Sequence, residues 1–104
     1  MLLIYGSTGY TGRLIVTEAL ARGLRPVLAG RTAESVRAQA EPLGLEWRAA
    51  SIDNPGALDA ALAGASVVLH CAGPFVHTWR AMSDACLRNH AHYLDITGES
   101  AVFE

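Results

Sequence analysis

Lysine is absent from this sequence, and cysteine is scarce. All eight basic residues are arginine, and ten acidic residues outnumber them, so the formal net charge is −2. Proteins that bind nucleic acid usually gather positive charge on one face, and this composition therefore argues against a nucleic-acid partner. The two cysteines, Cys71 and Cys86, are too few for a disulfide framework, and we expect a reducing, cytoplasmic setting.

Long apolar runs are missing as well. No run approaches the roughly 20 residues that a membrane-spanning helix needs, so we expect no membrane span. No basic segment precedes the apolar start at Met1, as it would in a signal peptide. Hydrophobic residues still make up 51% of the 104 residues, which excludes a disordered chain. We expect residues 1–104 to form one domain.

Short apolar segments alternate with stretches of helical periodicity along the whole chain. Five strands are expected: Leu2 to Tyr5, Pro26 to Ala29, Leu45 to Ala50, Ser66 to Cys71 and His92 to Ile96. Four helices are expected between them: Tyr10 to Arg22, Ala33 to Glu41, Pro55 to just before Gly64, and Thr78 to Asn89. The alternation predicts an α/β fold with a Rossmann-like, doubly wound parallel sheet of strand order 3-2-1-4-5, truncated after strand five.

Several apolar side chains are predicted to pack inside this fold. The first helix is expected to turn Leu14, Ile15 and Leu20 towards the core and to stop at Gly23. Trp47 and Trp79 are single aromatic residues, and we interpret both as packing residues.

Strand five would be an edge of the sheet, with the apolar run Ala101-Val102-Phe103 behind it. An apolar edge strand exposes unpaired backbone groups, which favours association with another chain. We therefore expect either a fragment of a longer protein, without its substrate domain, or a homo-oligomer that forms through this edge.

The first strand and the first helix are joined by a glycine-rich loop, Gly6-Ser-Thr-Gly-Tyr-Thr-Gly12. Its glycines follow the pattern GxxGxxG, whereas the standard dinucleotide fingerprint is GxGxxG. Gly6 would allow a sharp turn, Gly9 the close approach of a pyrophosphate, and Gly12 tight packing of the helix. Backbone N–H groups from Gly9 to Thr11 would face the anion, and the Thr8 and Thr11 hydroxyls could add hydrogen bonds. A plain glycine-rich turn is the alternative.

The end of the second strand indicates which nucleotide would bind. Domains that select NAD usually carry Asp or Glu here to hold the ribose 2′-hydroxyl. This sequence has Ala29-Gly30-Arg31-Thr32 and no carboxylate before Glu34. The planar guanidinium of Arg31 fits a 2′-phosphate and could stack on adenine, so the sequence favours NADP. A solvated loop arginine is the alternative.

Two further loops would border the nucleotide. Asp53 follows the third strand, where it could accept a hydrogen bond from the adenine amino group. It could equally cap the helix that begins near Pro55, as Asn54 could, and the sequence leaves both roles open. The small residues after strand four, in Cys71-Ala-Gly-Pro-Phe75, would let the nicotinamide end lie against the backbone.

Four motifs together resemble the NADP-binding domain of saccharopine dehydrogenase-like oxidoreductases, which include the trans-acting enoyl reductases. The motifs are Gly6-Ser-Thr-Gly-Tyr-Thr-Gly12, Leu28-Ala-Gly-Arg31, Val67-Val-Leu-His-Cys-Ala-Gly-Pro-Phe75 and His92-Tyr-Leu-Asp-Ile-Thr-Gly-Glu99. The resemblance implies a cofactor site lined by Gly6, Thr8, Gly9, Tyr10, Thr11, Arg31, Ala72, Gly73 and Pro74.

The same resemblance implies hydride transfer between NADP(H) and a small-molecule substrate. It also implies that a substrate and oligomerisation domain follows Glu104, so we expect this chain alone to be inactive. A non-catalytic NADP-binding or sensor module is the alternative function.

The sequence identifies neither a catalytic residue nor a metal site. His70 and Cys71 are neighbours on a strand and would point to opposite faces, and no Cys-x-x-Cys or His-x-x-x-His pair exists. Cys71 lacks an evident base beside it, which a nucleophile would need. We interpret Asp95 and Glu99 as a turn cap and a helix start rather than as an acid and base.

Overall fold

The computed structural model describes residues 1–71 and 75–95, and the side chains of residues 75–78 are not included. The strands are β1 (Leu2–Tyr5), β2 (Val27–Gly30), β3 (Trp47–Ala49), β4 (Val67–His70) and β5 (His92–Asp95). The α-helices are α1 (Tyr10–Ala21), α2 (Ala33–Ala40), α3 (Pro55–Leu62) and α4 (Phe75–Arg88), and a short 3₁₀ helix, Glu41–Leu43, follows α2. The fourth helix thus begins three residues before the predicted Thr78.

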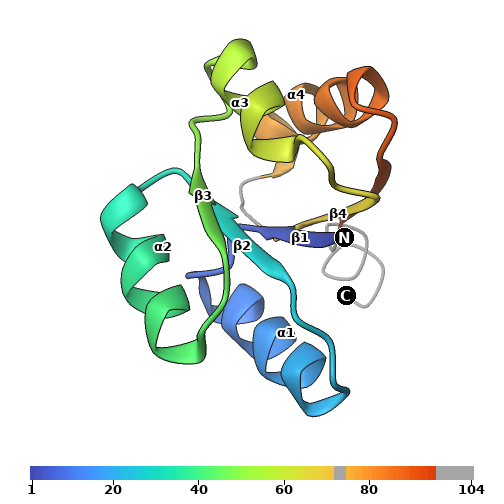
Figure 1. Cartoon of the computed structure of the whole chain (residues 1–104). Coiled ribbons are helices and arrows are strands. Elements are labelled where there is room, and N and C mark those ends of the chain that lie inside the picture. The colour runs from blue at the N-terminus through green and yellow to red at the C-terminus, as the bar shows by residue number, and fades with distance from the viewer. Residues whose placement is uncertain (72–74, 96–104) are drawn as a thin grey trace.

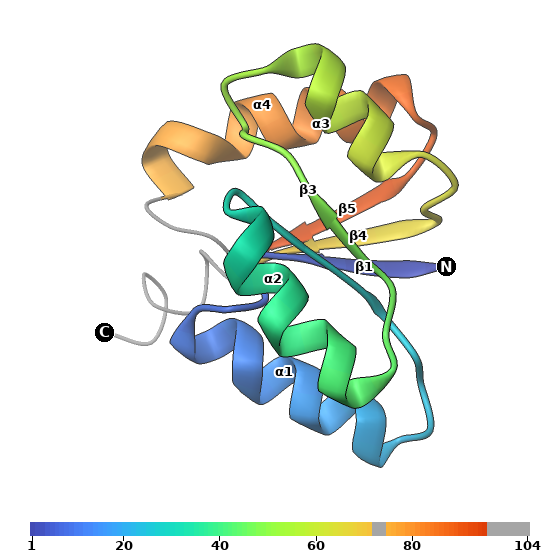
Figure 2. The same ribbon diagram turned by 60° about the vertical axis from the view of Figure 1, so that its left-hand side comes forward.

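The strands form one parallel sheet in the order β3-β2-β1-β4-β5. Helices α1 and α2 cover one face of this sheet, and α3 and α4 cover the other (Figures 1 and 2). The predicted α/β class, doubly wound architecture and strand order are therefore confirmed. The strand order changes direction between β1 and β4, and ligands of such sheets bind at the carboxyl ends of the strands on either side of that point.

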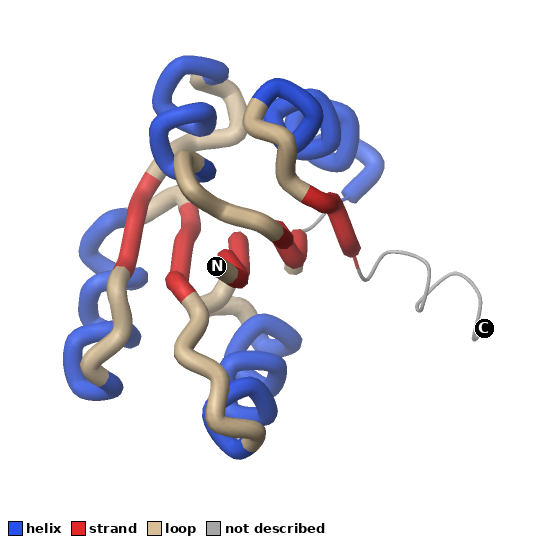
Figure 3. Tube along the Cα trace, turned by 45° about the vertical axis from the view of Figure 1, so that its right-hand side comes forward, coloured by secondary structure: helices blue, strands red, loops and turns tan. Residues whose placement is uncertain are grey.

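Alternate residues of the central strand, β1, belong to two separate hydrophobic clusters. Leu3 and Tyr5 belong to a cluster that also contains α3 and α4 residues, such as Leu62 and Met82. Ile4 belongs to the cluster of α1 and α2. The strands therefore lie between two helical layers, as Figure 3 shows, and both faces of β1 are buried. Burial on both faces explains why these strands are continuous apolar runs.

The buried face of α1 differs from the predicted one. Gly12, Val16 and Ala19 are buried, whereas Leu14 is 55% exposed and the prediction for Leu14 was wrong. Ile15 and Leu20 are half-buried, and both pack against the edge of the α1–α2 cluster. The face centred on Gly12 turns inwards because the smallest residues allow the helix to approach the sheet and the loop most closely. Apolar periodicity alone favours the larger side chains, and it therefore placed Leu14 in the core.

The end of α1 and the surroundings of the two tryptophans can be compared with the predictions from the sequence. Helix α1 ends as expected at Gly23, where the Leu24 N–H donates to the Ala19 carbonyl (2.9 Å) and Gly23 has a φ of +81°. Trp47 packs partly against the α1–α2 cluster. Trp79 is instead 43% exposed, so its predicted packing role was wrong. The guanidinium of Arg80 lies 4.9 Å from the Trp79 ring centre, a cation–π contact at the surface.

Candidate cofactor-binding site

The glycine-rich loop turns sharply off β1 and folds back onto the end of β2. Gly6 has a φ of +88°, a conformation that side chains with a Cβ rarely adopt. The backbone N–H groups of Gly6 and Ser7 both donate to the Ala29 carbonyl, at 2.8 and 3.3 Å. The Gly9 N–H donates to the Gly6 carbonyl at 3.2 Å. The loop therefore has one defined shape, anchored to the neighbouring strand.

Helix α1 begins with donors that nothing in its own sequence satisfies. Gly9 is the N-cap residue, no side-chain hydrogen bond caps the helix, and its first turn holds no acidic residue. The first N–H groups of a helix have no partner within the helix, and its dipole places partial positive charge beside them. Tyr10, exposed, and Thr11, half-buried, lie in this first turn, and Thr8 lies in the loop before it. Their arrangement fits a phosphate group.

Gly12 and Gly9 of this loop have different structural roles. A Cβ on Gly12 would lie 2.8 Å from the Ser7 Cα and 2.9 Å from the Ser7 carbonyl carbon, and closer still to the Gly6 oxygen. Gly12 therefore allows α1 to pack directly on the loop. A Cβ on Gly9 would meet only the Gly6 oxygen, at 3.6 Å, an ordinary contact. Gly9 thus leaves space beside the helix start, where a pyrophosphate can approach.

The loops after β2 and β3 meet beside Tyr5, the last residue of β1. The buried Tyr5 hydroxyl donates to the Ala50 carbonyl at 2.6 Å, which fastens the end of β3 to β1. Burial raises the pKa of Tyr5, while the charge of Arg31 lowers it and that of Asp53 raises it further. Both charges therefore act at the carboxyl end of β1. Arg31 and Asp53 each lie near enough to Tyr5 for their charges to act on its hydroxyl. Sequence reasoning had not singled out Tyr5.

A comparison with protein families shows which family this fold and sequence represent. Residues 2–103 match the family described as the saccharopine dehydrogenase NADP binding domain. The chain belongs to this family. The resemblance inferred from the four motifs is confirmed, and so is NADP as the cofactor of the family.

Two curated relatives illustrate how much of a longer protein this domain represents. The chain is 35% identical to the trans-acting enoyl reductase of Mycobacterium leprae over 105 residues, which cover 94% of this chain and 25% of the relative. It is 27% identical to the human saccharopine dehydrogenase-like oxidoreductase over 122 residues, which cover 99% of this chain and 28% of that protein. The NADP-binding domain thus spans about a quarter of the length of these relatives.

A solved structure supports the fold independently of sequence. The triphenylmethane reductase of Citrobacter sp., crystallised with NADP(H), superposes with a TM-score of 0.81 over 91% of this chain and 36% of that one. Its sequence identity is 21%, so the likeness concerns the fold.

Within this family domain, the structure excludes one of the two roles expected for Asp53. The Asn54 Oδ1 accepts a hydrogen bond from the Ala57 N–H at 3.1 Å and caps α3. Asp53 is exposed, and its backbone N–H donates to the Ser51 Oγ at 3.1 Å. The capping role for Asp53 was therefore wrong, and its carboxylate is left for other contacts.

Part of the predicted site lies outside the described residues. Ala72, Gly73 and Pro74, expected at the nicotinamide end, are in this group, as are Ile96, Glu99 and the apolar run Ala101-Val102-Phe103. The described chain reaches this end of the site at Cys71, which is half-buried and whose N–H donates to the Tyr5 carbonyl at 2.7 Å. The end of β4 is therefore held against the end of β1.

A buried polar residue, His70, lies at the carboxyl end of β4. It is fully buried, and its ring centre lies 5.9 Å from that of Tyr5 and 6.2 Å from that of Tyr93. Burial lowers the pKa of His70 to about 4, although the charge of Asp95 opposes this shift. Burial also raises the pKa of the Cys86 thiol to about 11. Both groups are therefore neutral near pH 7.

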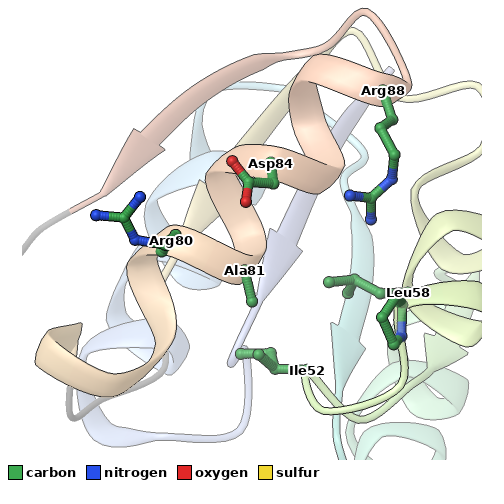
Figure 4. Close-up of a pocket in the computed structure, with 7 residues that line it drawn as sticks. Ile52, Leu58, Arg80, Ala81, Asp84 and Arg88 are labelled. Atoms are coloured by element: carbon green, nitrogen blue, oxygen red, sulfur yellow. The ribbon is translucent and has the colours of Figure 1, made fainter.

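A cavity of about 410 Å³ lies on the face of the sheet that α3 and α4 cover, between α4 and the chain leading into α3 (Figure 4). Ile52, Leu58 and Ala81 provide its apolar lining. Arg88 borders the cavity, and its guanidinium donates to the Asp59 carboxylate at 2.8 Å, which lowers the pKa of Asp59. Ile52 precedes Asp53, so the cavity lies next to the loop that follows β3.

Among residues 1–71 and 75–95, no three His, Cys, Asp or Glu residues are arranged to hold a metal ion. No helix in those same ranges is long and apolar enough to cross a membrane.

The two loop glycines should respond differently to one added methyl group. We expect Gly12→Ala to lower the free energy of unfolding by about 2–3 kcal/mol, because the new Cβ overlaps the loop backbone. Gly9→Ala is the matched control and should stay within about 1 kcal/mol of the original chain, since its φ of −73° suits alanine. Urea unfolding followed by circular dichroism measures both, and equal losses would contradict the assigned roles.

His70 should make the stability of the domain depend on pH. An unfolded histidine binds a proton near pH 6.5, whereas folded His70 binds one only near pH 4, so protonation in this window favours the unfolded state. The contribution of neutral His70 is complete above pH 6.5 and is lost as the pH falls towards 4, by about 3 kcal/mol at 1.36 kcal/mol per pH unit.

Chemical denaturation at several pH values tests this expectation. His70→Phe should show a shallower fall of unfolding free energy between pH 6.5 and 4, because the buried titrating group is gone. His92→Asn, at an exposed position of β5, should keep the original slope. Parallel curves for the original chain and His70→Phe would show that His70 does not control this range.

Proposed function

We propose that this domain binds NADP(H) in an oxidoreductase that transfers a hydride between the cofactor and a small-molecule substrate. The observation that carries the proposal is the uncapped start of α1 at the turning point of the sheet, together with Arg31, which follows β2 directly and whose charge acts on Tyr5 at the end of β1. An uncapped helix start favours a phosphate, and a nearby arginine favours a second one. NADP carries both groups, whereas NAD lacks the 2′-phosphate.

The pyrophosphate would lie at the start of α1. The Gly9 N–H, expected to face the anion, is bonded to the Gly6 carbonyl instead. The N–H groups of Tyr10 and Thr11 would therefore donate to the pyrophosphate oxygens, and the Thr8 and Thr11 hydroxyls would add hydrogen bonds. The turn at Gly6 carries the chain beneath this position without a side chain in the way. Every one of these groups belongs to a single turn of the backbone, so binding would require little rearrangement.

The adenosine end would lie over the ends of β2 and β3. Arg31 would pair with the 2′-phosphate, and Asp53 would accept a hydrogen bond from the adenine amino group. Their common effect on Tyr5 supports this placement, because it locates both charges at one edge of the sheet. The nicotinamide end would then lie past β4, against Ala72, Gly73 and Pro74.

The cofactor, when bound, supplies the hydride, and the protein supplies orientation and electrostatics. Because the domain spans about a quarter of its curated relatives, we propose that the substrate contacts lie in another part of a longer protein. We further propose a reducing, cytoplasmic location. A homo-oligomer through β5 completes the proposal, supported by the 56% exposure of Leu94 on that strand.

A non-catalytic NADP-binding or sensor module is the second candidate. It is favoured by the neutral state of His70 and Cys86, whose pKa values burial shifts away from ionisation. A neutral, inaccessible histidine or thiol is a poor acid–base catalyst near pH 7. Oxidation of NADPH by the full-length protein, with an enoyl thioester or another reducible carbonyl compound supplied, would exclude the sensor function.

The nucleotide preference is the decisive measurement for the proposed cofactor. We expect this chain to bind NADPH more tightly than NADH, and Arg31→Ala to weaken NADPH by about 30-fold, since a charge-assisted pair with phosphate contributes roughly 2 kcal/mol. Binding of NADH should hardly change, because it lacks the 2′-phosphate. Isothermal titration calorimetry measures both constants.

The matched control is Arg37→Ala, which removes an exposed arginine from the last turn of α2. It should leave both affinities near their original values. Gly9→Ala should instead weaken both dinucleotides, because its methyl group occupies the approach of the pyrophosphate. If Arg31→Ala and Arg37→Ala have the same effect, the general charge of the domain rather than Arg31 selects NADP.

A further inference from the structure

The phosphate loop is held from behind by one side chain of α2. The Nε2 of Gln39 donates to the backbone carbonyl of Ser7 at 2.8 Å. The Oε1 of Gln39 accepts a hydrogen bond from the Ser7 hydroxyl, also at 2.8 Å. Ser7 is fully buried, and the two residues are 32 positions apart in the sequence. One amide therefore makes two hydrogen bonds to a single loop residue.

These bonds orient the peptide group between Ser7 and Thr8. The Ser7 carbonyl and the Thr8 N–H belong to the same planar trans peptide, in which the two groups point in opposite directions. Because Gln39 holds the carbonyl towards α2, the Thr8 N–H must point away from α2. The Gly6 and Ser7 N–H groups are already bonded to the Ala29 carbonyl at the end of β2. The Thr8 N–H is thus directed to the side of the loop that faces away from α2.

Only an amide side chain suits both partners at this position. The Ser7 carbonyl needs a donor, and the Ser7 hydroxyl needs an acceptor. A glutamate of the same length would place a carboxylate oxygen against the carbonyl oxygen, and methionine would offer neither a good donor nor a good acceptor. A buried carbonyl that loses its donor is free to rotate towards another partner, and its peptide plane then changes direction.

We propose that Gln39 is a positioning residue for the pyrophosphate of the cofactor. It touches no cofactor atom itself, and it acts by fixing the Ser7–Thr8 peptide so that the Thr8 N–H faces the anion at the start of α1. The inference rests on the proposed function, because it assumes a dinucleotide at this loop. It assigns a role in binding to a half-buried helix residue outside every motif of the sequence.

Three ligands separate this role from that of Arg31. NADPH carries a pyrophosphate and a 2′-phosphate, NADH carries the pyrophosphate alone, and adenosine 2′-monophosphate carries the 2′-phosphate alone. We expect Gln39→Met to weaken NADPH and NADH by the same factor, about tenfold for one lost charge-assisted bond, and to leave adenosine 2′-monophosphate unchanged. Arg31→Ala should show the reverse selectivity, with NADH spared. Calorimetry and, for the weak monophosphate, NMR titration give the constants.

Two further variants keep the test decisive if Gln39→Met does not fold. Gln39→Glu keeps an acceptor for the Ser7 hydroxyl but loses the donor to the carbonyl, so it should weaken both dinucleotides at least as much. Ser7→Ala removes the hydroxyl and keeps the bond that orients the peptide, so it should cause a smaller loss. A melting curve for each variant shows whether the domain remains folded.

Two results would overturn the role of Gln39 alone. The first is a folded Gln39→Met or Gln39→Glu protein with unchanged dinucleotide affinities. The second is an equal loss for all three ligands together with a lower melting temperature, which would show a structural role only. If the original chain binds neither NADPH nor NADH, the proposed function is wrong. The role of Gln39, which depends on that function, is then wrong as well.

Discussion

The close approach of α1 to its own loop is the constraint on which the rest of this structure depends. Gly12 lies so near the backbone of Gly6 and Ser7 that no side chain fits between them. The helix can therefore begin directly at the carboxyl end of β1, with its first N–H groups at the point where the sheet changes direction. A bulkier residue would push the helix start away from that point, and the positive end of its dipole with it.

Anchoring to three different elements makes the loop part of a rigid surface. Its N–H groups bond to the end of β2, Gln39 holds it from α2, and Tyr5 ties the adjoining end of β1 to β3. Because Arg31 follows β2 directly, the residues proposed for the 2′-phosphate and for the pyrophosphate share one support. Such preorganisation lowers the entropic cost of binding a large, highly charged ligand.

On the other side of the site, at β4 and β5, burial keeps titratable side chains uncharged. His70 lies at the carboxyl end of β4 and Tyr93 within β5. Burial raises the pKa of Tyr93 and lowers that of His70, so both stay neutral. The Tyr93 hydroxyl donates to the Asp95 carboxylate at 2.7 Å, which also favours the protonated phenol. This region therefore supports the sheet next to the site proposed for the cofactor.

The sequence by itself determined the fold and the outline of the site, since both depend on local patterns. Alternating strands and helices predicted the parallel sheet, and the spacing of Gly6, Gly9 and Gly12, with Arg31, predicted the nucleotide loop and its preference. Only the tertiary structure decided that Leu14 is exposed rather than in the core and that Asn54 caps α3, leaving Asp53 exposed. Local patterns also missed Tyr5 and Gln39, whose partners lie 45 and 32 positions away. Side chains that act through such distant contacts carry no signal at their own positions, because folding alone brings their partners within hydrogen-bonding distance.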